Sequence, residues 1–257
     1  MSNQLYQKFT IASERAWIVG DIHGQYELLI KRLAQLGFDP QQGDRLFSVG
    51  DLIDRGPDSL KTLQLLNKPW FYAVMGNHEQ MLLKGLDAMA GKGNIADILN
   101  WQTFNGGDWY HPKSDMALKV AAMLEKVKSL PMAIELETES GRIGIVHAAV
   151  PGNQWLRQEC LAAADIQKHL LWYRDNALLA RQYQQPEVTS SPQQRETHQV
   201  SGIDKVVVGH TIMTGGNPVY LGNTLYLDVG AANGTTPAVI SAQKVLQIHT
   251  QGSFTLS

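Results

Sequence analysis

Apolar residues are gathered in short runs that end in a turn residue or a polar side chain. Four runs, at residues 17–19, 46–49, 72–75 and 206–208, lead into a glycine, and a fifth, at residues 142–146, leads directly into a histidine. Short runs bounded by turn residues are typical of buried strands. Glycine at a strand end permits a sharp turn and a close approach of two backbone segments. The pattern therefore predicts five buried strands with polar groups at their ends.

Leucines at near-helical spacing separate the first of these strands. They recur in this way over residues 26–36, and Gly37 is a suitable C-terminal stop. Further helices are expected from Asp58 or Ser59 through Leu66, over residues 79–90, and over residues 115–130. The alternation of strands and helices predicts βαβ units with parallel strand pairing.

The end of the chain has a different pattern. Residues 224–228 and 237–250 are expected to form strands joined by short turns. Residues 182–199, rich in Gln, Ser, Thr and Pro, are expected to form a long surface loop. A chain of 257 residues can form one large domain or two small ones, and no boundary divides this one, so a single domain over residues 1–257 is expected.

Charge and cysteine content limit the partners and the compartment. The chain carries 22 Lys and Arg against 24 Asp and Glu, so it has no excess of positive charge that would attract nucleic acid. A local cluster of metals and arginines could still bind an anion. A lone cysteine, Cys160, allows no internal disulfide and indicates a reducing compartment. The first residues lack the features of a signal peptide, and no window reaches the roughly 18 apolar residues of a membrane span. A cytoplasmic location without a membrane or nucleic-acid partner is therefore expected.

The polar residues at the strand ends form a candidate metal site. Residues just past the carboxyl ends of strands converge on one crevice in open α/β sheets. The candidates, with His23 added from the same turn as Asp21, are Asp21, His23, Asp51, Asn77, His147 and His210. A lone histidine in a strand is more often a packing residue, and a lone aspartate is often a cap, but coincidence at five strand ends is implausible.

The chemistry of this set favours two ions rather than one. Carboxylates, imidazoles and an amide oxygen suit first-row divalent metals better than calcium. A catalytic metal keeps at least one position open, so six ligands are better matched by two ions that share a bridging carboxylate. Paired metals about 3.5–4 Å apart recur in phosphoryl transfer. The residues therefore predict a two-metal site for phosphate chemistry.

Three segments with the expected order and spacing carry a resemblance to a known family. Residues 20–24 (GDIHG), 50–56 (GDLIDRG) and 76–79 (GNHE), completed by His147 and by Gly209 with His210, resemble the signature blocks of the PPP family of metallophosphatases. The likeness extends over roughly residues 17–230 and is greatest to the bacterial and bacteriophage lambda-type protein phosphatases. It implies an α/β calcineurin-like metallophosphoesterase fold, with two mixed β-sheets sandwiched between helices and the site at one edge.

The resemblance also implies residue roles. Asp21, His23 and Asp51 would hold one divalent ion, and Asp51 would bridge to a second that is also bound by Asn77, His147 and His210. His78 would protonate the leaving group, and Asp54 would hydrogen-bond its ring. Arg55 and Arg174 would bind phosphate oxygens, with Arg181 as the alternative to Arg174. Manganese is the expected metal, with iron or zinc as alternatives, and a metal-bridging hydroxide would attack phosphorus directly.

The implied substrate is a phosphorylated protein or peptide. Phosphoserine and phosphothreonine are expected, and phosphotyrosine is expected as a further substrate because bacterial relatives often accept it. No obligate regulatory subunit is expected, because residues 226–232 replace the aromatic and cysteine-bearing segment of the eukaryotic branch. Two alternatives stay open. One is a symmetrical diadenosine tetraphosphatase or another small-molecule phosphohydrolase, against which Asp54 and Glu79 argue, and the other is a non-catalytic phosphopeptide-binding module.

Four aromatic residues lie between the third block and His147. They are Trp101, Phe104, Trp109 and Tyr110, around a Gly-Gly pair. They could form an apolar wall for a phosphopeptide or pack a helical cap onto the sheets, and packing is favoured.

Overall fold

The structure is a computed structural model that describes residues 5–184, 198–249 and 252–256. Most of the loop expected at residues 182–199 lies outside these ranges. Within the part described, no helix is both long and apolar enough to cross a membrane.

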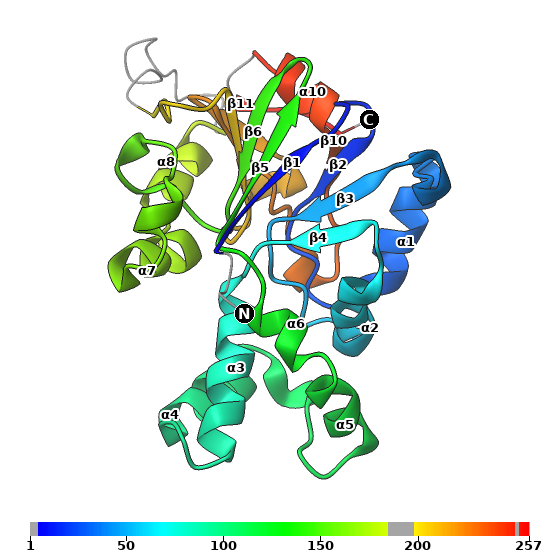
Figure 1. The fold of residues 1–257 in the computed structure, drawn as a ribbon, viewed down its shortest axis with the longest axis vertical. Coiled ribbons are helices and arrows are strands. Elements are labelled where there is room, and N and C mark those ends of the chain that lie inside the picture. Colours follow the sequence, from blue (N-terminus) through cyan, green and yellow to red (C-terminus); the bar gives the residue numbers. More distant parts are fainter. Residues whose placement is uncertain (1–4, 185–197, 250–251, 257) are drawn as a thin grey trace.

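Two mixed β-sheets form the centre of the molecule (Figure 1). The larger has seven strands in the order β1 (Tyr6–Thr10), β5 (Ala133–Thr138), β6 (Gly141–Ile145), β7 (Lys205–Val208), β9 (Thr224–Tyr226), β8 (Val219–Leu221) and β11 (Gly252–Ser253). The smaller has four strands in the order β10 (Val239–Ser241), β2 (Ala16–Val19), β3 (Arg45–Ser48) and β4 (Phe71–Ala73). The five strands predicted from the apolar runs are β2, β3, β4, β6 and β7, and all five are confirmed.

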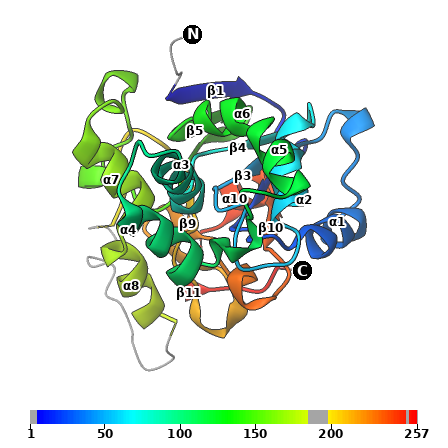
Figure 2. The ribbon, with the colours of Figure 1, turned by 90° about the horizontal axis from the view of Figure 1, so that it is seen from below.

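The first half of the chain forms the expected βαβ units. Strands β2, β3 and β4 are paired in parallel, with Trp17 beside Leu46 and Phe47 beside Tyr72. Helices α1 (Tyr26–Gln35) and α2 (Ser59–Leu63) connect them and lie outside the smaller sheet (Figures 1 and 2). Parallel strands need such crossovers, and the crossover helices cover the sheet face.

Helices surround the two sheets on several sides. On the far side of the larger sheet lie α7 (Ala164–Trp172) and α8 (Asp175–Gln182), opposite α1 and α2 (Figures 1 and 2). Helices α3 (Asn77–Met89), α4 (Ile95–Ile98), α5 (Asp115–Ala121) and α6 (Leu124–Lys128) lie together at one end of the sheets, at the bottom of Figure 1. The single helix expected over residues 115–130 is thus two short helices, α5 and α6.

Apolar side chains pack between the sheets as well as under the helices. Ile18 and Phe47 from the smaller sheet share one fully buried cluster with Ile145, Val207 and Leu225 from the larger sheet. Burying each such side chain contributes about 1.5–3 kcal/mol. This shared core holds the two sheets face to face, and it holds the strand ends of both at a common edge.

The prediction for the end of the chain is wrong in part. Strand β9 forms as expected, but residues 237–250 contain only the short strand β10 before helix α10 (Ala242–Gln247) begins. The Ser241 hydroxyl accepts a hydrogen bond from the Lys244 backbone N–H at 3.2 Å, which caps this helix. The apolar residues Ala242 and Val245 are three positions apart and both are fully buried. A spacing of three suits one face of a helix.

Candidate active site

The strand ends of both sheets bring the expected polar residues together. Asp21 and Asp51 follow β2 and β3, Asn77 begins α3, which is the next element after β4, and His147 and His210 follow β6 and β7. The side chain of each is at most 5% exposed. His23 is buried beside them, at 3% exposure. Segments that are more than a hundred residues apart in the chain therefore meet at one point.

The backbone around this point is held in unusual conformations. Six non-glycine residues in the described ranges have positive φ angles, and five of them belong to the site: His23, Asp51, Asp54, Arg55 and His210. A residue in this region of φ/ψ space costs about 1–3 kcal/mol and persists only where the surroundings hold it in place. Such strain clusters at sites where side chains must be aimed precisely for function, which singles out this edge of the sheets.

Glycines beside these residues allow close packing of the loops. A Cβ atom on Gly209 would collide with the Asp21 carboxylate, and one on Gly76 would collide with Asp51. The close approach expected of these glycines is therefore present. Glu79 joins the same loops, because its carboxylate accepts hydrogen bonds from the backbone N–H groups of Asp51 at 2.9 Å, Leu52 at 2.8 Å and Gly76 at 3.0 Å.

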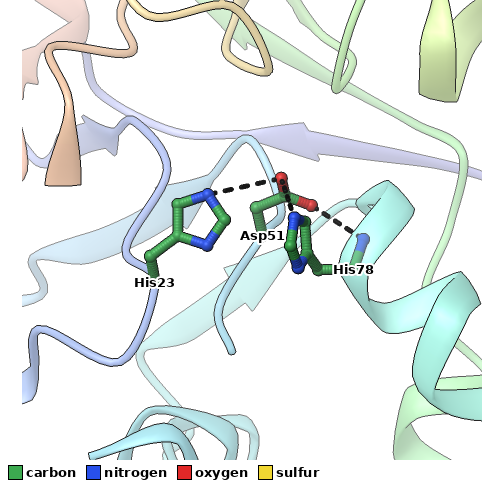
Figure 3. A group of neighbouring side chains, drawn as sticks. All are labelled: His23, Asp51 and His78. Carbon is green, nitrogen blue, oxygen red and sulfur yellow. Dashed lines mark hydrogen bonds and ion pairs between the residues drawn. The ribbon is translucent and has the colours of Figure 1, made fainter. Parts of the chain in front are cut away.

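Asp51 lies at the centre of two groups of potential metal ligands. In the first, His23 Nε2 lies 3.6 Å and His78 Nε2 lies 3.9 Å from Asp51 Oδ2, and the His78 backbone N–H donates to Oδ1 at 3.0 Å (Figure 3). In the second, His147 Nε2 lies 3.4 Å from Asp51 Oδ1, and His210 completes the group. Each group could hold an ion, and both use Asp51.

Hydrogen bonds to the backbone set the tautomers of two histidines. Nδ1–H of His147 donates to the Val49 carbonyl at 2.8 Å, and that of His23 donates to the Ile53 carbonyl at 3.0 Å. The Nε2 atom of each neutral ring is then unprotonated and carries a lone pair, which is the form that binds metals. Burial lowers the pKa of His147 and lowers that of His23 to about 3, so both rings stay neutral.

The arrangement of acceptors around Asn77 fits a cation. His147 Nε2 faces Asn77 Oδ1 at 2.8 Å, and His210 Nδ1 lies 2.9 Å from the same oxygen. The Nε2 atom of His210 is buried and has no hydrogen-bond partner among the residues that the structure describes. Lone pairs that converge in a buried place repel one another unless a cation lies between them. The donor set and its geometry therefore fit divalent metals.

Asp21 lies beside these groups rather than inside them. Its Oδ2 atom is 3.9 Å from His23 Nε2, and its two oxygens accept the His210 backbone N–H at 3.1 and 3.0 Å. Burial and the nearby charges of Asp228 and Asp51 raise its pKa well above the ordinary value. A buried carboxylate among other carboxylates is costly to ionise, and a bound cation removes that cost.

His78 is held by a buried carboxylate. Its Nδ1–H donates to Asp54 Oδ2 at 2.7 Å, and both side chains are at most 3% exposed. Burial lowers the pKa of His78, but the charge of Asp51 and the hydrogen bond to Asp54 raise it more, so the net pKa is above its ordinary value. With Nδ1 engaged, Nε2 is the atom that faces the cavity.

Arginines line the same cavity as His78. They are Arg55, Arg174 and Arg181. Arg174 Nη1 donates to the His210 carbonyl at 2.8 Å and to Thr211 Oγ1 at 3.1 Å, which fixes the guanidinium beside the histidine cluster. Arg181 Nε donates to the Ile212 carbonyl at 2.6 Å. Arg181, considered only as an alternative to Arg174, thus lies at the site together with it.

Asp228 is a site residue that the motif-based prediction missed. It lines the cavity, is 2% exposed, and its Oδ1 atom accepts the Gly230 N–H at 2.9 Å. A signal was present in the sequence, because Asp228 follows the end of β9 as Asp21 follows the end of β2. No glycine precedes it, and it belongs to none of the signature blocks.

The aromatic residues 101–110 divide between two roles. Trp101 is fully buried and Tyr110 is 8% exposed, so the expected packing is confirmed for both. Phe104 is 75% exposed. The indole N–H groups of Trp101 and Trp109 both donate to Asp54, a contact that sequence reasoning did not anticipate.

Replacing Asp228 with asparagine is expected to stabilise the metal-free protein. Burial and the charge of Asp51 raise the pKa of Asp228 from 3.8 to about 6. The folded state thus binds a proton more tightly than the unfolded state. The protonated carboxyl group therefore stabilises the folded state at low pH, and this contribution is lost as the pH rises through about 6. At pH 7.5 the free energy of unfolding of the variant is expected to exceed that of the parent protein by about 1–3 kcal/mol, since each pKa unit corresponds to about 1.4 kcal/mol.

Urea unfolding of chelator-treated protein at pH 7.5 and at pH 3.5 measures this effect. The gain should be present at the higher pH and nearly absent at the lower one, where the carboxyl group of the parent protein is mostly protonated in both states. Equal stability of variant and parent at pH 7.5 would contradict the prediction.

Comparison with known proteins identifies the family. Residues 14–213 match the family model described as calcineurin-like phosphoesterase. The chain is 37% identical over 235 residues to serine/threonine-protein phosphatase 2 of Escherichia coli (strain K12), covering 91% of this chain and 95% of that protein. It is 33% identical over 156 residues to the symmetrical bis(5'-nucleosyl)-tetraphosphatase of Shewanella sp. (strain MR-7), covering 56% of this chain and 48% of that protein.

A solved structure shares the fold. The cold-active protein-tyrosine phosphatase of a psychrophilic Shewanella species superposes with a TM-score of 0.54 at 17% identity, over 91% of this chain and 77% of that one. At this identity the likeness concerns the fold alone. The family match spans the residues that build the two ligand groups, the His78–Asp54 pair and the strand ends that carry them. The chain therefore belongs to the calcineurin-like phosphoesterase family.

Proposed function

We propose that this protein is a metal-dependent phosphoprotein phosphatase that hydrolyses phosphoserine and phosphothreonine, with phosphotyrosine as a further substrate. The observation that carries the proposal is the position of His78. Asp54 holds its ring at 2.7 Å, and the ring also faces a cavity lined by arginines and by four of the potential metal ligands, which are His23, Asp51, Asn77 and His210. A proton donor, an anion-binding group and a cation site together suit the cleavage of a phosphate ester.

The ligands of two divalent ions are assigned from the residues that converge. Asp21, His23 and Asp51 would hold one ion, and Asp51, Asn77, His147 and His210 would hold the other. His78, which also lies in the first group, is assigned instead as the proton donor because Asp54 engages its ring. When bound, such a pair activates the attacking water and neutralises charge on the phosphoryl oxygens. Manganese is the metal we infer, with iron or zinc as alternatives, because these ligands suit all three.

His78 would act as the general acid. Its Nε2–H would donate a proton to the oxygen of the departing serine or threonine, and Asp54 would stabilise the ring while it carries a positive charge. Serine and threonine alkoxides are strongly basic, so protonation as the bond to phosphorus breaks matters most for these substrates. No phosphorylated enzyme intermediate is required.

Arginine side chains would bind the phosphate of the substrate. The planar guanidinium matches two phosphoryl oxygens at once, which lysine cannot do. Arg55 and Arg174 are the proposed pair, and Arg181 lies close enough to contribute. Together they would orient phosphorus toward the metal ligands and leave the ester oxygen toward His78.

A protein substrate is favoured over a dinucleotide. The match to the phosphoprotein phosphatase extends over most of both chains, whereas the match to the symmetrical tetraphosphatase covers about half of each. Asp54 and Glu79, the two residues that argue against a tetraphosphatase, both make hydrogen bonds here. Asp54 contacts His78, and Glu79 contacts three backbone N–H groups.

We infer a cytoplasmic phosphatase without an obligate regulatory subunit.

Phosphate release by chelator-treated protein tests this function. With manganese restored, a phosphothreonine peptide is expected to be hydrolysed, while diadenosine tetraphosphate at equal concentration is spared. Without added metal, both are expected to stay intact.

Each other outcome has a defined meaning. Cleavage of the dinucleotide alone would keep the metal site and overturn the phosphoprotein assignment. Phosphotyrosine peptide in a parallel reaction measures the breadth of the specificity. Failure on all substrates, with tight binding of the phosphopeptide, would favour the non-catalytic binding module.

A further inference from the structure

We propose that Trp101 and Trp109 are positioning residues for leaving-group protonation, because their indole N–H groups hold the Asp54 carboxylate in the orientation that aligns His78. The proposal rests on the proposed function, in which His78 is the general acid. Neither tryptophan would touch the substrate or the reacting atoms in this role. Each would act through Asp54.

The hydrogen bonds of Asp54 account for both of its oxygens. Oδ1 accepts from Trp109 Nε1 at 2.6 Å, and Oδ2 accepts from His78 Nδ1 at 2.7 Å. Trp101 Nε1 lies 3.1 Å from each oxygen and donates between them. The side chain of Asp54 is fully buried, and within the described part of the chain these three groups are the donors to its carboxylate.

An indole is well suited to this task. Its N–H group donates and cannot accept, so Asp54 stays an acceptor on every side. Hydrogen bonds to a buried charged group are about twice as strong as neutral ones. The two indole rings lie nearly perpendicular, at 85°, with their centroids 6.4 Å apart, so the donors approach from different directions. Rotation of the carboxylate about its Cβ–Cγ bond would break at least one of these bonds.

The packing of the aromatic segment keeps the indoles in place. Trp101 is fully buried, and a Cβ atom on either Gly85 or Gly107 would collide with its ring. The same segment also reaches the phosphate side of the cavity, because the Gly106 carbonyl accepts a hydrogen bond from the Arg55 backbone N–H at 3.2 Å. Residues 101–109 thus contact Asp54, which holds the proposed acid His78, and also Arg55, which would bind phosphate.

The consequence depends on the leaving group. Without the indole donors, Asp54 could rotate and His78 Nε2–H would no longer be aimed at the ester oxygen. An ester with a poor leaving group, such as phenyl phosphate, needs that proton. p-Nitrophenyl phosphate does not, because nitrophenolate departs as a stable anion. A loss of alignment therefore acts selectively, whereas a general loss of folded protein lowers both rates equally.

The test is Trp109→Phe, assayed for kcat on both phosphate esters with manganese. Trp109 is only partly buried, and phenylalanine keeps an aromatic ring while removing the donor. The expected loss is about tenfold or more on phenyl phosphate and about threefold or less on p-nitrophenyl phosphate. Should the variant fold poorly, benzothienylalanine at position 109 retains the ring shape and lacks the N–H group. An unchanged ratio of the two rates in a folded variant would overturn the proposal.

Trp155→Phe is the matched control. Trp155 Nε1 also donates to a buried carboxylate, Glu135 Oε2 on strand β5, at 2.9 Å, but Trp155 does not line the cavity. This variant should lower the melting temperature without changing the ratio of the two rates. A change of the ratio in Trp155→Phe would show that the ratio reports stability, and that outcome would overturn the proposal too.

Combining Trp109→Phe with His78→Asn separates this inference from the proposed function. In His78→Asn the ratio should already be altered, and adding Trp109→Phe should change it no further, because the acid is gone. If His78→Asn leaves the ratio as in the parent protein, the acid role itself fails. If His78→Asn alters the ratio and Trp109→Phe alone does not, only the positioning role fails.

Discussion

Replacing His78 with asparagine is expected to lower kcat on a phosphothreonine peptide by about 10²–10⁴-fold, the usual contribution of a general acid. The side chain lies against Asp54 at 2.7 Å, and its Nε2 atom lies 3.9 Å from Asp51, at the edge of the proposed metal site. The hydrogen bond from the backbone N–H of residue 78 to Asp51 does not depend on the side chain, so it is kept in the variant. The amide of asparagine cannot donate the proton to a departing alkoxide. The loss should therefore fall on turnover rather than on folding.

Three measurements define this result. They are kcat and KM on the peptide, the metal content by elemental analysis, and the melting temperature. The metal content should stay close to that of the parent protein. His111→Asn is the matched control, because His111 is exposed and does not line the cavity, and it should leave all three values unchanged. Near-normal turnover in His78→Asn would remove His78 from the acid role.

Replacing Asp51 with asparagine is expected to abolish turnover and to lower the metal content at the same time. Asp51 is the member common to both ligand groups, with His23 Nε2 at 3.6 Å and His147 Nε2 at 3.4 Å from its oxygens. Burial raises its pKa, but the imidazoles of His147, His78 and His23 lower it more, so the carboxylate is ionised in the fold. An amide lacks that charge and has one oxygen instead of two.

The effect can be followed without an activity assay. Adding manganese should raise the melting temperature of the parent protein, since a ligand at 100 times its Kd stabilises the folded state by about 2.7 kcal/mol. Asp51→Asn should lose most of this shift. Asp44→Asn is the control, because Asp44 is a buried carboxylate paired with Arg15 away from the site, and it should keep the shift. Full metal content in Asp51→Asn would contradict the proposal that Asp51 would help to hold both ions.

Much of the site could be predicted from local sequence alone. The strand-and-turn pattern around Asp21, Asp51, Asn77, His147 and His210 depends on neighbours in the chain, and the structure brings these side chains together. A buried strand needs a run of apolar residues, and a ligand at its end needs a tight turn that glycine permits. Both requirements act over a few residues. They are therefore visible in the order of the amino acids.

Short, weakly patterned elements were the least predictable. Helix α10 was expected as strand, because six residues carry little periodicity and the deciding features are a cap at Ser241 and burial against the sheets. Asp228 went unnoticed, because it follows a strand of only three residues and no glycine precedes it. Whether an aspartate after such a strand lies in the cavity or at the surface depends on which strands become neighbours.

The order of the amino acids is enough to predict the strand ends, the types of candidate ligand and the family to which they belong. It does not predict that Asp54 receives two indole N–H groups, which come from residues that lie 47 and 55 positions further along the chain. Backbone turns and strand periodicity are local properties, whereas a hydrogen bond to a buried carboxylate depends on how separate segments pack. Trp101 and Trp109 are apolar enough to be read as packing residues, and their single polar atom acquires its role only when the fold places Asp54 beside it.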